Sequence, residues 1–160
     1  MSHLVSDAID PSRTRREDRI IQRAIAALER RLFNAGPMLA RADVVRDYLR
    51  LKLVALPNEM FAVIFLDNRS RVIAYEPMFQ GTVDQTIIFP RVVARRALEL
   101  NASSVIFSHQ HPSGIVTPSP ADRAITKKLK VALATVDIKV LDHFIIGEGS
   151  PYSFAEAGLL

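Results

Sequence analysis

Hydrophobic positions recur at helical spacing near the start of the chain. Between residues 15 and 33, apolar side chains return every three or four positions, and arginines occupy other parts of the helical wheel. The apolar positions are Ile20, Ile21, Ala24, Ile25, Leu28 and Leu32. This pattern predicts an amphipathic helix that follows a flexible polar leader (residues 1–13) and ends at Gly36-Pro37. A second helix is predicted from residue 41 or 42 to residue 53.

The pattern then changes to the spacing of strands. The nearly continuous apolar run 60–67 is typical of a strand that is covered on both faces, and residues 71–76 predict its partner in a hairpin. Further short strands are predicted at 86–89, 104–107, 138–141, whose apolar pattern continues over 144–146, and 152–154. Further helices are predicted at 91–100, 119–135 and 155–160. This order predicts an α/β fold, a three-layer sandwich in which a mixed sheet carries helices on both faces.

Composition limits the classes of protein to which the chain can belong. With 160 residues, of which 49% are hydrophobic, it can bury one core, so we expect residues 38–160 to form one domain preceded by an extension, residues 1–37. The absence of cysteine excludes disulfides, thiolate catalysis and thiolate metal sites. Neither a membrane-spanning run nor a signal peptide is visible, which predicts a cytoplasmic protein with no membrane partner.

The net charge of +4 permits contact with nucleic acid without requiring it. Arginines of the first predicted helix supply much of this excess, and a solvated polar face is the usual role of such residues. The apolar stripe of the same helix offers a surface for pairing with a second copy of the chain, so a homo-oligomer is a further expectation.

One connection concentrates possible chemistry. Residues 108–118 follow an apolar β-branched run and precede a helical pattern that begins at Ser119. His109 and His111 are two positions apart on an extended segment, so both imidazoles project toward one side and reach one metal ion. Asp122, in the first turn of the next helix, is a candidate third ligand. Three protein ligands and one open position for water form the arrangement of catalytic zinc.

The same residues also have a simpler interpretation. Ser119, Pro120 and Asp122 fit the ordinary start of a helix, with serine as N-cap, proline in the first turn and an acidic residue favoured by the helix dipole. Histidines also occur in loops that bind no metal. From the residue types alone, capping and metal binding both stay open.

The longer motif resembles a known family. The run from His109 to Pro112, with Ser119 and Asp122, matches His-X-His-Pro followed by Ser-X-X-Asp at the required spacing, and is similar to the JAB/MPN (JAMM) metalloprotease superfamily. Ser113-Gly114 and residues 141–147 extend the match to the RadC-like branch over residues 40–160. The resemblance implies a deaminase-like three-layer fold and a Zn²⁺ ion.

The resemblance also implies catalytic residues. Glu76 stands in the Glu-X-X-Phe-X-Gly-Thr context of RadC-like sequences and is the implied general base, because a zinc hydrolase needs a carboxylate that is not a ligand. Ser119 is the implied donor to the oxyanion. Without the resemblance, Glu76 is an exposed glutamate at a strand end. Glu59, before the first strand, competes for the role of base.

Two polar residues interrupt the last long apolar run. Asp142 and His143 are either a satisfied buried pair or groups that orient metal ligands. For His143 we favour the structural interpretation, since no spacing argument connects it to the motif.

These residues and the resemblance support two functions. The first is a zinc-dependent metallohydrolase, a JAMM-type peptidase or isopeptidase, whose activated water attacks a carbonyl of a peptide or protein substrate. The second is a RadC-type, DNA-repair-associated accessory protein with a vestigial or structural metal site. A nuclease is a third interpretation, although two histidines and one carboxylate are fewer ligands than a two-metal site uses. Zinc deaminases use cysteine ligands, which this chain lacks.

Overall fold

The structure is a computed structural model that describes residues 11–33, 42–81 and 86–160. Its helices and strands are α1 (Pro11–Phe33), α2 (Ala42–Leu53), β1 (Met60–Leu66), β2 (Val72–Gln80), α3 (Pro90–Glu99), β3 (Ser104–Gln110), α4 (Pro120–Ala134), β4 (Lys139–Ile146) and β5 (Tyr152–Ser153). None of the helices in these ranges is long and apolar enough to cross a membrane.

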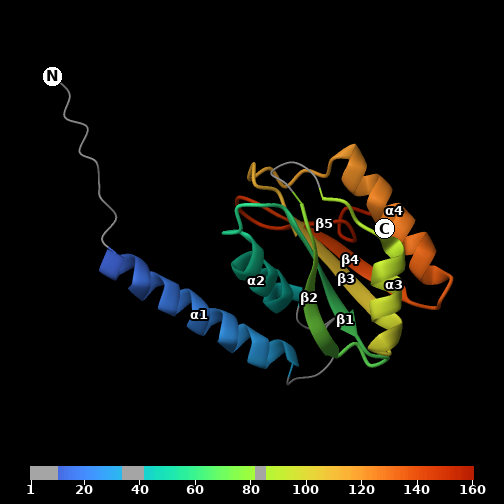
Figure 1. Ribbon diagram of the computed structural model, residues 1–160, viewed down its shortest axis with the longest axis horizontal. Helices are drawn as coiled ribbons and strands as arrows, with labels where there is room; N and C mark the ends of the chain where they lie inside the picture. The colour runs from blue at the N-terminus through green and yellow to red at the C-terminus, as the bar shows by residue number, and fades with distance from the viewer. Residues whose placement is uncertain (1–10, 34–41, 82–85) are drawn as a thin grey trace.

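The strands form one mixed sheet in the order β2-β1-β3-β4-β5 (Figure 1). Strands β3 and β4 run parallel, and every other neighbouring pair is antiparallel. Helix α4 connects the two parallel strands, as a βαβ crossover requires. The carboxyl ends of β3 and β4 therefore lie at the same edge of the sheet, next to the start of α4.

Each face of the sheet has its own hydrophobic core. On one face α1 and α2 pack through Ile25, Leu32 and Leu49 against β-strand residues such as Ile64 and Ile106. On the other face α3 and α4 contribute Val93, Ala97, Leu129 and Leu133, which pack against Phe61, Val63, Phe65, Val105 and Phe107. Neighbouring strand residues thus alternate between the two cores, and the predicted three-layer α/β sandwich is confirmed (Figure 1).

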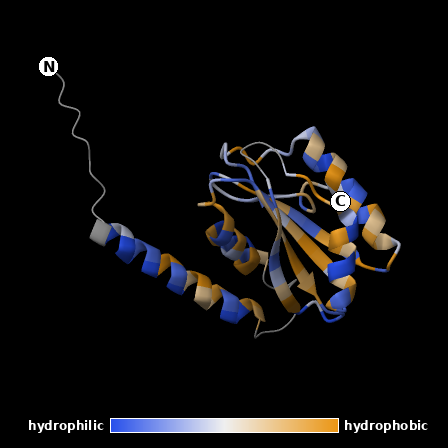
Figure 2. Ribbon diagram, in the orientation of Figure 1, coloured by the Kyte–Doolittle hydropathy of each residue, from blue (hydrophilic) through white to orange (hydrophobic). Residues whose placement is uncertain are grey.

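Helix α1 is amphipathic, as its periodicity predicts. Figure 2 shows it as alternating hydrophilic and hydrophobic bands, and its carboxyl-terminal half contacts α2. The helix begins at Pro11, inside the segment expected to be a flexible leader. The rest of that leader, and the expected helix stop at Gly36-Pro37, lie outside the described residues.

Two predicted elements are wrong. Residues 86–89 form no strand: the chain is extended at Phe89, but the residues of this segment pair with none of the described strands. Residues 155–158 form turns and 159–160 are irregular, so no helix forms here, and Gly158 has a positive φ of 68°. Local sequence preference does not supply the neighbouring strand that a ladder needs, and a helix of six residues is marginal without packing.

Two strands are longer than predicted. β2 continues through Pro77 to Gln80, which an edge strand tolerates because no further strand needs the missing N–H. β3 continues through His109 to Gln110, so the first histidine of the motif is a sheet residue. That position fixes the backbone of His109 between Phe61 of β1 and Ile145 of β4.

Candidate metal centre

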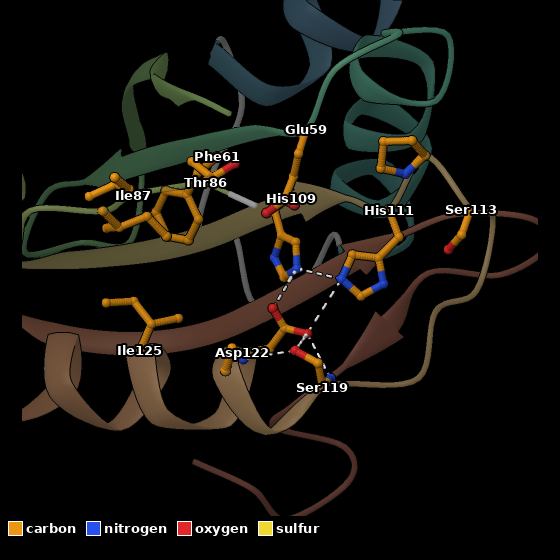
Figure 3. A pocket seen from close by; sticks show the side chains of 13 residues that line it. Glu59, Phe61, Thr86, Ile87, His109, His111, Ser113, Ser119, Asp122 and Ile125 are labelled. Carbon is orange, nitrogen blue, oxygen red and sulfur yellow. Dashed lines mark hydrogen bonds and ion pairs between the residues drawn. The ribbon is translucent and has the colours of Figure 1, made fainter. Parts of the chain in front are cut away.

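The two motif histidines and Asp122 meet at the carboxyl end of β3 (Figure 3). The Nε2 atom of His109 lies 2.9 Å from Nε2 of His111 and 3.1 Å from Oδ1 of Asp122. Nε2 of His111 lies 3.4 Å from Oδ2 of Asp122. His109 and Asp122 are buried and His111 is half-buried, so three potential ligand atoms converge in a largely desolvated place.

These separations fit a small tetrahedral cation. Zinc bonds of about 2.0–2.2 Å to nitrogen and oxygen place neighbouring tetrahedral ligands roughly 3.3 Å apart. Two measured separations, 2.9 Å between the two Nε2 atoms and 3.1 Å between His109 Nε2 and Asp122 Oδ1, lie close to that value. One ligand atom from each of the three residues lies within 4.8 Å of the others, so the group could hold a metal ion.

The Nδ1 atom of His111 has a partner of its own. It lies 2.6 Å from the carbonyl oxygen of Ile115, which can only accept, so Nδ1 carries the proton and donates it. Neutral His111 consequently presents the lone pair of Nε2 to the centre. The loop is closed by a turn in which Gly114 N–H donates to the carbonyl of His111.

Ser119 and Asp122 form a capping box at the start of α4. The Asp122 N–H donates to Ser119 Oγ at 3.1 Å, and Oδ2 of Asp122 accepts both from the Ser119 N–H and from Oγ–H at 2.7 Å. The capping bonds fix the carboxylate while Oδ1 faces His109. The two interpretations that the sequence leaves open for these residues are thus compatible in one structure.

Electrostatics of the centre follow from this packing. Burial raises the pKa of Asp122, but hydrogen bonds with His109 and His111 outweigh burial and hold the pKa far below its usual range. The hydrogen bond with Asp122 raises the pKa of His111, and burial opposes that shift. Asp122 therefore stays ionised, as a metal ligand must.

A cavity of about 590 Å³ opens over the centre. Its lining includes Glu59, Ser119 and the three candidate ligands, with an apolar wall formed by Phe61, Ile87, Ile88 and Ile125 (Figure 3). Glu59 precedes β1, and its charge contributes to the raised pKa of His111. The structure thus brings a carboxylate beside the candidate ligands from a part of the chain distant in sequence.

Glu76 is not among the lining residues of this cavity. It lies on β2 opposite Val63, one strand farther from β3. Both carboxylate oxygens accept from the Arg96 guanidinium of α3, at 2.6 and 2.9 Å. Glu76 is thus engaged in a bidentate pair and does not line the cavity, so the geometry does not place the expected base at the site.

Gln110, between the two histidines, is a functional candidate that no pattern in the sequence singles out. It is fully buried, and its carboxamide points to the segment that carries Glu59. Oε1 accepts from the Met60 N–H at 2.7 Å, and Nε2 donates to the carbonyl of Asn58. The residue type alone gives no signal for this contact, because the contact depends on the pairing of β1 with β3.

His143 contacts the centre as well. Its Nε2 atom lies 2.8 Å from Nδ1 of His109, although no spacing in the sequence connects the two residues. Burial holds the pKa of His143 well below its usual value, and the neighbouring His109 lowers it further. Asp142 is satisfied elsewhere: it accepts from the backbone N–H groups of His143 and Ala155 and from Ser153 Oγ.

Comparison with known proteins identifies relatives along most of the chain. Residues 39–159 match the model of the RadC-like JAB domain. The chain is 55% identical over 124 residues to a UPF0758 protein of Leptothrix cholodnii, covering 78% of this chain and 56% of that protein. It is 48% identical over 147 residues to the UPF0758 protein YkfG of Escherichia coli K12, covering 92% of this chain and 93% of that protein. The chain thus spans little more than half of the Leptothrix relative.

Proposed function

Because the chain belongs to the RadC-like JAB domain family, we propose that it is a zinc-dependent hydrolase that cleaves peptide or isopeptide bonds. The observation that carries the proposal is the convergence of His109, His111 and Asp122 on one point beside an open cavity. Three ligands with one free position are typical of catalytic zinc, whereas structural sites use four protein ligands.

In this proposal His109, His111 and Asp122 hold the ion. Bound zinc supplies Lewis-acid chemistry, which acidifies water and polarises the carbonyl of the scissile bond. The chain's own residues then have three tasks: to accept a proton from the attacking water, to return it to the leaving amine, and to stabilise negative charge on the carbonyl oxygen.

We assign the proton transfers to Glu59 instead of Glu76. Glu59 lines the cavity together with the candidate ligands, whereas Glu76 is paired with Arg96. A general base must come within hydrogen-bond reach of the proton that it removes, directly or through one water, and of the two carboxylates Glu59 has the supporting position.

Ser119 keeps the role of oxyanion donor in the proposal. Its hydroxyl lines the cavity and donates to Oδ2 of Asp122. In the proposal the hydroxyl turns from Asp122 Oδ2 to the carbonyl oxygen of the substrate, while the Ser119 N–H continues to donate to Oδ2. Ser119 thus has two roles in the proposal: it caps the helix in the resting protein and donates a hydrogen bond to the oxyanion during the reaction.

Four proteins test this function: wild type, Glu59→Gln, Glu76→Gln and His109→Ala. Each is reconstituted with Zn²⁺, analysed for bound metal and assayed with fluorogenic peptides and lysine-linked isopeptides. Wild type should bind about one zinc per chain and hydrolyse a member of the set. Glu59→Gln should keep zinc and lose at least about 10²-fold in kcat, the usual contribution of a general base. Glu76→Gln should keep both the zinc and the activity of wild type, and His109→Ala should lose the metal.

Two results would contradict the proposal. Wild type without stoichiometric zinc after reconstitution would remove the metal centre. A Glu59→Gln variant that hydrolyses as fast as wild type, beside an inactive Glu76→Gln that still binds zinc, would return the base to Glu76.

A second candidate function rests on α1. This helix carries seven arginines against three acidic residues, a local excess that equals the net charge of +4 of the whole chain. An accessory role on nucleic acid would use such a helix for phosphate contacts. Binding of the purified chain to duplex DNA should then weaken steeply as salt is raised, and no binding at low salt would contradict this candidate.

A further inference from the structure

We propose that Thr126 and His143 are positioning residues that set the tautomer of His109 and so direct its Nε2 lone pair to the metal. The inference rests on the metal-binding part of the proposed function. It extends the centre to two buried side chains outside the His-X-His and Ser-X-X-Asp motif. Three hydrogen bonds, which run from α4 through β4 to β3, connect these side chains to His109.

The first bond begins at Thr126. Its hydroxyl donates to the backbone carbonyl of Asp122, one helical turn earlier, at 2.6 Å. A carbonyl oxygen can only accept, so this bond uses the single proton of the hydroxyl. Thr126 Oγ1 also lies 2.6 Å from Nδ1 of His143. The oxygen must accept in that second contact, and Nδ1 of His143 must carry the proton.

A neutral imidazole carries a proton on only one of its nitrogens, so a ring protonated on Nδ1 has an unprotonated Nε2. Nε2 of His143 lies 2.8 Å from Nδ1 of His109, so His143 accepts and His109 donates. Neutral His109 then has its proton on Nδ1. Its Nε2 lone pair faces His111 and Asp122, which is the orientation that a metal ligand requires.

His111 shows why a threonine is needed behind His143. Nδ1 of His111 donates directly to a carbonyl, the Ile115 oxygen, which is an acceptor in every state. His109 instead donates to a histidine nitrogen, which accepts only while the other nitrogen of the same ring is protonated. Thr126 provides the acceptor that keeps His143 in that tautomer.

Packing holds the His143 ring in the required plane. The residue is fully buried. Its ring stacks on Phe154 with centroids 4.8 Å apart and meets the rings of Phe61 and Phe107 edge to face. Asp142 holds the segment that carries Phe154, through Ser153 Oγ and Ala155 N. Because the ring is enclosed, its orientation is fixed. Hydrogen bonding alone then decides which of the two ring nitrogens carries the proton.

The direct test is nitrogen-15 NMR of the histidine rings in zinc-loaded wild-type protein, which needs no variant. Long-range coupling patterns distinguish a protonated Nδ1 from a protonated Nε2. The proposal expects His143 to be protonated on Nδ1, so that its Nε2 accepts from Nδ1 of His109. A His143 protonated on Nε2 would overturn it, whatever the catalytic activity of the protein.

Three threonine variants supply the second test. Thr126→Val keeps the shape and removes the acceptor, Thr126→Ser restores the hydroxyl, and Thr135→Val is the matched control. Thr135 also donates to a backbone carbonyl of α4, that of Ala132, but it is exposed at the far end of the helix. Zinc affinity is measured by competition with a chromophoric chelator, and folding by thermal unfolding of each metal-free variant.

The expected result is a 10- to 100-fold loss of zinc affinity in Thr126→Val, the usual effect of removing a group that supports a ligand. Thr126→Ser should bind within about threefold of wild type, and Thr135→Val should equal wild type. A folded Thr126→Val that binds zinc like wild type would overturn the inference. A protein that binds zinc and shows these effects but cleaves no substrate would leave the inference standing and would contradict only the proposed hydrolase.

Discussion

Asp122 serves both a helix and the candidate metal centre. Oδ2 completes the capping box with Ser119 and lies 3.4 Å from Nε2 of His111, and Oδ1 faces His109. The capping bonds reduce the freedom that the carboxylate would otherwise lose on binding a metal. The same carboxylate therefore caps the helix and is a candidate metal ligand, so weakening the cap should lower the affinity of the centre for metal.

Ser119→Ala should show this coupling. Loss of the N-cap hydroxyl should lower the free energy of unfolding by about 1 kcal/mol, and zinc affinity should fall because Asp122 Oδ2 loses a donor. Ser119→Asn, which restores an N-cap acceptor, should recover most of the stability. Urea unfolding and zinc competition measure the two effects. Unchanged stability in the alanine variant would show that the capping bond contributes nothing.

Gln110 offers a second prediction at the scale of one residue. Gln110→Leu should leave the N–H of Met60 and the carbonyl of Asn58 without their present partner. We expect a loss of about 1–3 kcal/mol for a buried group left unpaired, and slower hydrolysis because the segment that carries Glu59 is no longer held. Zinc content should stay at the wild-type level.

The exposed Gln22→Leu on α1 is the matched control, and its stability should stay within about 0.5 kcal/mol of wild type. A Gln110→Leu protein with full activity would contradict the role given to the carboxamide. Urea unfolding, metal analysis and the peptide assay together separate the loss of stability from the loss of activity.

The sequence predicts the ligands of this centre better than their supporting residues. His109, His111 and Asp122 lie in one strand-to-helix connection, so their spacing along the chain is close to their arrangement in space. Glu59 and His143 reach the centre only because β1 and β4 flank β3 in the sheet. Strand order is a tertiary property, and no local pattern encodes it.

At the scale of the elements, the end of β4 fits closely against the loop of His111. The His111 N–H donates to the carbonyl of Ile146, and the Glu148 N–H donates to the carbonyl of Gly114. Between these bonds lies Gly147, where an added Cβ would meet the backbone of Gly114 and come within 2.9 Å of Val116 Cγ1. The loop keeps its position because residue 147 has no side chain.

Gly147→Ala should therefore push the loop outward and weaken zinc binding at least about tenfold, since a displaced His111 loses its ligand geometry. Gly149→Ala is the control: its φ is +80°, but an added Cβ meets nothing within 4 Å. It should cost about 1–2 kcal/mol of stability through backbone strain and leave zinc affinity unchanged. Equal zinc affinity in the two variants would contradict the close fit.

Helices and strands that pack against a partner lie where the sequence predicts them, and predicted elements without such a partner do not form. Helix α2 and strand β1 lie within a residue or two of the predicted bounds because each has an apolar pattern that the core satisfies. The β-rich residues 86–89 have the composition of a strand but no neighbour among the described strands, and Thr86, Ile87 and Ile88 line the cavity instead. A strand forms here only if a neighbouring strand pairs with it, and the intrinsic preference of the residues does not decide that pairing.

At the scale of the molecule, the two faces of the sheet have separate tasks. The candidate centre belongs to the face covered by α3 and α4, where Phe61 and Phe107 lie in the same layer as His109. The opposite face is covered by α1 and α2, which pack on it through Ile25, Leu32 and Leu49. This separation predicts that the α1 contact stabilises the fold without affecting metal binding.

Leu32→Ala tests that separation and also the expected boundary between residues 1–37 and 38–160. Leu32 is 4% exposed in the core beneath α1, so its truncation should cost about 2–5 kcal/mol if α1 unfolds together with the domain. Ile20→Ala, at a 57% exposed position of the same helix, should stay within about 0.5 kcal/mol of wild type. Zinc affinity of the folded variants should not change.

A single cooperative urea transition that shifts to lower denaturant would place α1 in the same folding unit as the domain. An unshifted main transition in Leu32→Ala would instead make α1 an extension that folds independently of the sheet.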